Sequence, residues 1–163
     1  MMNRNLQSVK NWKRNIILFL GSQTISLFGS SLVQYAIMWY ITLSTQSGLM
    51  MTLYILAAFL PSFLLSPFAG VWADRYNRKT LIILSDALIA LVTFILAILF
   101  LLGYDSLWLL FVIAAVRAFG TGIQTPTVGA IIPLLVPEEK LTMINGLNGS
   151  IQALITLVGP LAS

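Results

Sequence analysis

The chain has 163 residues, of which 58% are hydrophobic and only 9% are charged, and its formal net charge is +4. A soluble globular domain carries roughly a quarter charged residues, so most of this chain is expected to lie out of contact with water. The sequence has no cysteine and no histidine. It therefore cannot form disulfides, and it lacks the commonest zinc ligand and the usual general base, so we do not expect an enzyme.

From Asn15 to Ala73 the sequence contains no charged residue. A bilayer core is crossed by about 20 helical residues, so this run is too long for one transmembrane helix and fits two joined by a turn. The basic residues flank apolar segments, which is typical of membrane topology and does not indicate binding to nucleic acid.

A basic arm of residues 1–15 precedes five apolar segments, which predict an all-α integral membrane protein. The first segment is far longer than the core of a signal peptide, so it is expected to be retained as a span. We expect Pro61 and Pro67 to break the second segment, and Pro126 or Pro133 to bend or end the fourth. The five segments cover about residues 16–43, 49–73, 80–102, 107 to between 129 and 136, and 141–163.

The lysines and arginines outside the segments occur on alternate connections. They lie in the N-terminal arm, between the second and third segments, and between the fourth and fifth, while the other two connections have none. The positive-inside rule then places the N-terminus in the cytoplasm. We expect a multi-pass protein of the cytoplasmic membrane, with the lipid bilayer as its first partner.

Three segments carry polar residues at helical spacing. Small polar residues also pack helices together in lipid, which is an equal alternative for the serines and threonines. Glutamine and asparagine along a whole face are better explained by a water-filled cavity that these faces line. The three stripes are Gln23, Ser26, Ser30 and Gln34; Arg117, Thr121, Gln124 and Thr127; and Asn145, Asn148, Gln152 and Thr156.

Arg117 and Asp86 are the charged residues inside the segments. Arg117 is about ten residues from the outer end of the fourth segment, where a lone cation costs ~2.5–3.5 kcal/mol on insertion scales and needs a cavity or a partner. Asp86 lies closer to the inner end of the third segment. A salt bridge between the two is one interpretation; the others are that Asp86 snorkels toward the cytoplasm or bonds a neighbouring helix.

The connection after the second segment reads Gly70-Val71-Trp72-Ala73-Asp74-Arg75-Tyr76-Asn77-Arg78-Lys79. The pattern Gly-x-x-x-Asp-Arg-x-x-Arg-Lys between the second and third spans resembles the signature loop of the major facilitator superfamily. We expect Gly70 to permit close packing at the helix end. Many members have glycine where this chain has Asn77, and asparagine tolerates the left-handed conformation that a tight turn would need.

Two further stretches are similar to the same family. Arg117 matches the position of an intramembrane arginine linked to proton coupling, although Gly120 and Gly122 do not follow at the usual spacing. Gly159-Pro160 resembles the core of a signature of drug–proton antiporters. The run 132–139, Ile-Pro-Leu-Leu-Val-Pro-Glu-Glu, is similar to the macrolide-efflux and siderophore-export branch.

The resemblance implies a proton-driven exporter of small amphipathic compounds that works by alternating access, with the proton gradient as energy source and no bound cofactor. Asp74, Arg75 and Arg78 would then act in the conformational switch, and the first and fourth spans would line the cavity. Export of a siderophore, lipid or metabolite is an alternative, and so is an inactive truncated fragment. The resemblance covers the first five of the family's twelve helices, so the remaining helices would be partners, together with the small-molecule substrate.

Overall fold

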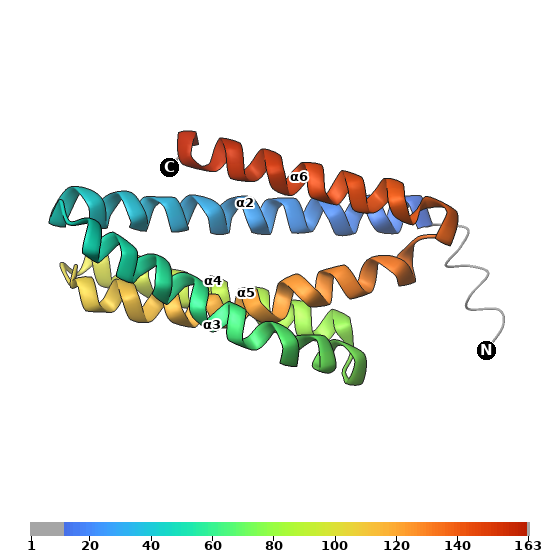
Figure 1. The fold of residues 1–163 in the computed structure, drawn as a ribbon, viewed down its shortest axis with the longest axis horizontal. Helices are drawn as coiled ribbons and strands as arrows, with labels where there is room; N and C mark the ends of the chain where they lie inside the picture. The colour runs from blue at the N-terminus through green and yellow to red at the C-terminus, as the bar shows by residue number, and fades with distance from the viewer. Residues whose placement is uncertain (1–11, 163) are drawn as a thin grey trace. The chain divides into compact units, whose positions relative to one another are not determined.

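The computed structural model describes residues 12–162, which form five long α-helices and one short 3-10 helix (Figure 1). All five long helices are long and apolar enough to cross a membrane, which confirms the predicted all-α architecture with five spans. Their bounds are α2 Trp12–Thr45, α3 Gly48–Arg75, α4 Arg78–Leu101, α5 Leu107–Leu135 and α6 Leu141–Ala162, with the 3-10 helix η1 at Glu138–Lys140.

The first helix begins earlier than the sequence predicted. α2 starts at Trp12, so the last residues of the expected arm 1–15 are helical. Residues 1–11 of that arm lie outside the described residues. Lys13 and Arg14 therefore belong to the first turn of the helix itself.

The prediction that Pro61 and Pro67 break the second span is wrong. Both prolines lie inside the uninterrupted helix α3. Helix α5 likewise continues through Pro126 and Pro133 and ends at Leu135. Membrane helices tolerate proline because neighbouring helices, hydroxyl side chains and small local adjustments satisfy the carbonyl groups that proline frees.

Short connections with specific chemistry reverse the chain between consecutive helices (Figure 1). Ser47 caps α3, since its hydroxyl accepts from the Met50 amide at 3.5 Å. At the end of α4, Gly103 adopts a φ of 83°. The Gly103 amide donates to the Phe100 carbonyl, and the Tyr104 amide donates to the Leu99 carbonyl. This is the bonding pattern of a Schellman motif, which needs a residue free to adopt the left-handed conformation.

The chain divides into two compact units, and α2 and α5 each contribute to both. One unit is the chain up to Leu32 together with the chain from Gly129 onward, and the other is Val33–Val128. The core of the first contains Ile16, Leu20, Ile132, Val136 and Ile144. The core of the second contains Ile37, Ile41, Tyr54, Val92, Leu96, Leu110, Ile113 and Ala114.

Large apolar side chains are exposed along whole helices outside these cores. On α3, Phe59, Phe63 and Phe68 are each more than 60% exposed. Soluble monomers rarely expose apolar patches of more than a few hundred Å². Side chains of this kind are stable against lipid tails or against further helices.

Two glycines on α5 allow its neighbours to approach closely. A Cβ atom at Gly120 would lie 2.7 Å from the Ile89 side chain on α4, and one at Gly122 would lie 2.8 Å from the Ser62 Cα on α3. Non-bonded carbon atoms cannot come so near without displacement, so at these two positions the absence of a side chain lets α4 and α3 pack directly against the backbone of α5. Small residues at helix interfaces commonly serve this purpose in membranes.

Candidate functional site

The polar face of α2 does not have one uniform environment. Gln23 is buried, Ser26 and Ser30 are half-buried, and Gln34 is exposed. Gln34 makes a hydrogen bond through its backbone: its main-chain carbonyl oxygen accepts from the Tyr54 hydroxyl at 3.2 Å. Gln34 and Tyr54 belong to the second unit, so this bond joins α2 to α3 there.

The polar residues of α5 are mostly buried. Arg117 is 8% exposed, Gln124 is 4% exposed and Thr127 is fully buried, whereas Thr121 is exposed. The hydroxyls of Thr121 and Thr127 donate to carbonyls four residues back in their own helix, at 3.2 and 2.6 Å. The two threonine hydroxyls therefore form their hydrogen bonds within α5, while the side chains of Arg117 and Gln124 form hydrogen bonds with a neighbouring helix.

Polar side chains join α5 to α4 at two levels of the described helices. Gln124 Nε2 donates to Asp86 Oδ1 at 2.6 Å, and Arg117 Nη1 donates to Thr93 Oγ1. The two acceptors are seven residues apart on α4, and the two donors are seven residues apart on α5. The residue that comes first on α4 pairs with the one that comes later on α5, as antiparallel packing requires. Seven helical residues, two turns, separate the two bonds by about 10.5 Å.

Gly120 explains how the two helices come close enough for both bonds. It lies between Arg117 and Gln124 on α5, and a Cβ atom there would meet Ile89 and the Ser85 carbonyl of α4. Ile89 in turn lies between Asp86 and Thr93. The small residue thus sets the helix separation at the midpoint of the two polar contacts.

Of the interpretations of Asp86, the structure shows the one in which it bonds a neighbouring helix. The Asp86 carboxylate accepts a hydrogen bond from the Gln124 amide, and two turns away along α4 the Thr93 hydroxyl oxygen accepts one from the Arg117 guanidinium. Burial of a charge is tolerated when hydrogen bonds replace its water, and neutral amide and hydroxyl groups supply them here.

An apolar cleft of about 380 Å³ lies beside this contact in the second unit. Its lining includes Thr93, Ile37, Leu96 and Phe100, with Tyr40 as the other polar member. The Tyr40 hydroxyl donates to Asp105 at 3.0 Å. The volume is at the small end of ligand pockets, and the lining is not the polar, multi-stripe surface that the sequence predicted.

The polar residues of α6 are more exposed than those of α5. Asn145, Gln152 and Thr156 are exposed and Asn148 is half-buried. Further along the helix Gly159 is buried and Pro160 is half-buried. An exposed amide stripe on an apolar helix needs water or a further polar surface against it, because lipid tails offer no hydrogen bonds.

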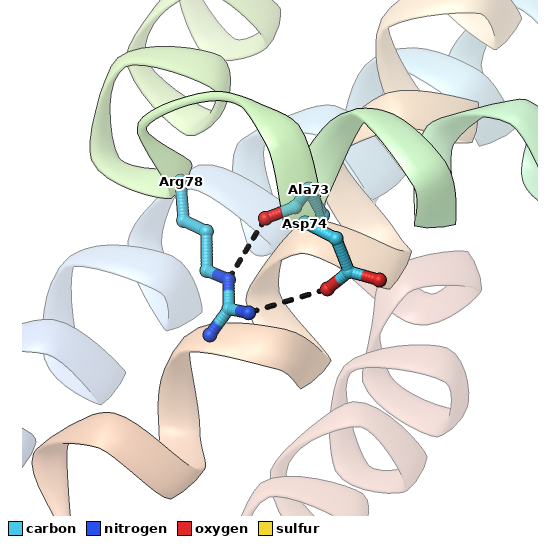
Figure 2. A network of polar contacts seen from close by, with 3 residues as sticks. All are labelled: Ala73, Asp74 and Arg78. Carbon is cyan, nitrogen blue, oxygen red and sulfur yellow. Dashed lines mark hydrogen bonds and ion pairs between the residues drawn. The ribbon is translucent and has the colours of Figure 1, made fainter.

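The connection between α3 and α4 is held by Arg78, the first residue of α4 (Figure 2). Its Nε donates to the Ala73 carbonyl at 2.9 Å, and its Nη2 lies 3.3 Å from Asp74 Oδ1. The guanidinium therefore covers a terminal carbonyl of α3 and pairs with a carboxylate of the same turn. Because Asp74 is 76% exposed, the ion pair itself adds little stability, and its value lies in fixing the turn.

Two expectations for this connection are wrong. A Cβ atom at Gly70 would meet no heavy atom of the described residues within 4 Å, so Gly70 does not permit a close approach here. Asn77 has a φ of −65° and is not left-handed. It is the N-cap of α4, and its side chain accepts from the amides of Lys79 and Thr80 at 3.0 and 3.4 Å. Arg75 and Lys79 are exposed.

Sequence reasoning missed Thr93 and Tyr54. Thr93 occupies the position seven residues after Asp86, which is the same face of α4 two turns later, so the spacing of a polar pair could have indicated it. Tyr54 is an isolated hydroxyl in an apolar run, and no spacing in the sequence singles it out.

The helices and their exposed apolar surfaces define a multi-pass α-helical membrane protein. The sequence model of the Major Facilitator Superfamily matches residues 19–163. The chain therefore belongs to this superfamily, as the signature loop predicted.

Three curated relatives show how far the similarity extends. Macrolide efflux protein A of Streptococcus pyogenes is 34% identical over 155 residues, which is 95% of this chain and 38% of that protein. Macrolide efflux protein A of Enterococcus faecalis is 36% identical over 105 residues, 64% of this chain and 32% of that protein. The uncharacterized MFS-type transporter YfiS of Bacillus subtilis (strain 168) is 27% identical over 149 residues, 91% of this chain and 34% of that protein. The chain thus spans under two fifths of the length of these relatives, and no solved structure matches it.

The N-cap role of Asn77 can be tested by substitution. Asn77→Ala should lower the free energy of unfolding by about 1 kcal/mol, because two amides at the start of α4 lose their acceptor. Asn77→Ser, which keeps a capping oxygen, should stay near the wild-type value. Thermal unfolding of the detergent-solubilised protein from the complete gene measures both. If alanine is as stable as serine, the cap contributes nothing.

Proposed function

We propose that this chain is the N-terminal part of a secondary active transporter that exports small amphipathic compounds, with macrolides as the first candidates. The observation that carries the proposal is the 34% identity to macrolide efflux protein A of Streptococcus pyogenes over 95% of the chain. Membership of the superfamily supports the same class of protein. No enzymatic activity is proposed.

The proposed mechanism is alternating access driven by proton entry. Transporters of this fold rock two halves about a site near the middle of the bilayer, and this chain would supply most of one half. The positions of the basic connections support an N-terminus in the cytoplasm, and the membrane would be the cytoplasmic membrane. The remaining helices would complete the cavity toward which the amide stripe of α6 would face.

Within this mechanism, the part-buried polar contacts between α4 and α5 are proposed to take part in proton coupling. Asp86 is the acidic side chain of this contact, and we propose that it is the group that exchanges protons during transport. Arg117 is a permanent cation, because guanidinium does not lose its proton in proteins. A change in the protonation of Asp86 alters the field around Arg117 across about two helical turns.

The α3–α4 connection is proposed to act in the conformational switch. Arg78 binds both the Ala73 carbonyl and the Asp74 carboxylate, so it ties the end of α3 to the start of α4. Arg75 and Lys79 remain at the surface, where they can meet the other half of the transporter.

Drug-susceptibility profiling of a host that lacks its own exporters tests this function. Expression of the complete gene should raise the inhibitory concentration of macrolides, and a protonophore should restore macrolide accumulation to the level of the empty host. Resistance that a protonophore does not change would contradict proton coupling. A profile with no change for any macrolide would contradict the proposed substrate class.

Substitution of Asp86 separates a role in transport from a role in folding. Asp86→Asn keeps an oxygen that accepts from Gln124 but removes the group that binds a proton. We expect membrane abundance near the wild-type level and macrolide efflux at least tenfold slower, within the range of effects attributed to general acid–base groups.

Two companion variants complete this test. Asp105→Asn, at the outer end of α2 and α4, changes a carboxylate outside the proposed pathway and should leave efflux near the wild-type rate. Arg117→Ala should also slow efflux at least tenfold if the cation takes part in coupling. Efflux by Asp86→Asn at the wild-type rate, or loss of the protein from the membrane, would contradict the proposed role of Asp86.

A further inference from the structure

We propose that Thr93 is the residue that positions the Arg117 guanidinium for coupling. This inference rests on the proposed function, in which Arg117 takes part in proton-driven export. Thr93 itself is assigned no contact with substrate. Its task is to hold one nitrogen of the guanidinium at a fixed place on α4.

The first argument is the bonding of the Thr93 hydroxyl. Its Oγ1 donates its proton to the Ile89 carbonyl of its own helix at 2.7 Å. A hydroxyl has one proton and two acceptor lone pairs, so the bond to Ile89 leaves only acceptor capacity for a neighbour. Arg117 Nη1 donates to that oxygen. The bond to Ile89 therefore fixes the direction of the hydroxyl proton. The Thr93 oxygen can accept a hydrogen bond from the guanidinium, but it has no second proton to donate.

The second argument is the fixed separation of α4 and α5. Gly120, one turn after Arg117, brings α5 to within backbone distance of Ile89 and of the Ser85 carbonyl. Gln124 and Asp86 make a second contact two turns from the first. A helix held at two levels has little freedom to rotate or slide, so the position of Thr93 relative to the Arg117 backbone is determined.

The third argument is the charge of the partner. Thr93 is neutral, so it replaces part of the water around the guanidinium without cancelling its charge. A carboxylate at this place would pair with the cation and neutralise it. Arg117 is 8% exposed, so the field of its charge is little screened by solvent.

The test compares three variants expressed from the complete gene, with uptake of radiolabelled erythromycin into inside-out membrane vesicles as the assay. Thr93→Val removes the hydroxyl and keeps the shape, whereas Thr93→Ser keeps the hydroxyl. Thr42→Val is the matched control, because the Thr42 hydroxyl also bonds a carbonyl four residues back, that of Met38 at 2.8 Å, and its contact with another helix is to the Met51 sulfur of α3 at 3.8 Å and not to Arg117.

Thr93→Val should slow uptake by about tenfold, the size expected when one hydrogen bond to a charged group is lost. The KM for erythromycin should change little, and the pH at which uptake is half-maximal should shift. Thr93→Ser and Thr42→Val should keep the wild-type rate and pH profile. Uptake by Thr93→Val with the wild-type rate and profile would overturn the proposal. Equal losses in Thr93→Val and Thr93→Ser would also overturn it, because packing of the side chain would then be responsible.

A second measurement distinguishes failure of this inference from failure of the proposed function. If wild-type vesicles take up no erythromycin, the function is wrong, but the contact is still testable by thermal unfolding in detergent. Thr93→Val and Arg117→Met should then lower the Tm by less together than the sum of their separate effects. Additive effects would show that the two side chains are not coupled and would overturn the positioning role.

Discussion

Arg117 is a permanent cation in a segment surrounded by apolar residues, and its need for hydrogen bonds constrains the packing around it. The guanidinium must find acceptors within reach of its stem, since the insertion of an arginine at mid-helix is unfavourable by ~2.5–3.5 kcal/mol without them. Thr93 on α4 supplies one of these acceptors. For the contact to form, α4 must be antiparallel to α5, close to it and in one register.

The surrounding residues meet these conditions. Gly120 removes the side chain that would hold the helices apart, and the Gln124–Asp86 bond fixes the register two turns away. Gly122 likewise lets α3 approach α5 closely, because it also has no side chain at the contact. At the cytoplasmic ends in the proposed topology, Arg78 joins α3 to α4. The second unit is thus held by apolar burial and by a few polar contacts at defined levels.

The architecture could be predicted from the sequence because it depends on composition and length. The charge-free run from Asn15 to Ala73 and the signature loop indicated the spans and the family, and both predictions are confirmed. The prolines of α3 were misread as breaks. The rule that proline ends a helix comes from soluble proteins, whereas in a membrane the unpaired carbonyl has partners in neighbouring segments and the helix continues.

The details of the site could be predicted only in part. Helical spacing indicated Arg117 and Gln124 but could not give their partners, because partners depend on which helices pack together and in which register. Thr93 is one hydroxyl among many, and only its place opposite Arg117 distinguishes it. Asn77 was expected in a left-handed turn because glycine is common there in relatives, yet its oxygen caps α4. Asparagine suits both roles, so the residue type alone does not decide between them.

The most direct test of the central contact is oxidative cross-linking between α4 and α5. The chain has no cysteine, so the pair Ile89→Cys and Gly120→Cys can be introduced without background from it. A Cβ atom at Gly120 would lie 2.7 Å from Cγ1 of Ile89, and a cysteine at position 89 puts its sulfur in place of that carbon, so the double substitution should cross-link rapidly in membranes. The pair Leu91→Cys and Gly120→Cys should not, because Leu91 is 58% exposed and lies on another face of α4. Rapid cross-linking of both pairs, or of neither, would contradict the packing of α4 against α5 on which the position of Arg117 depends.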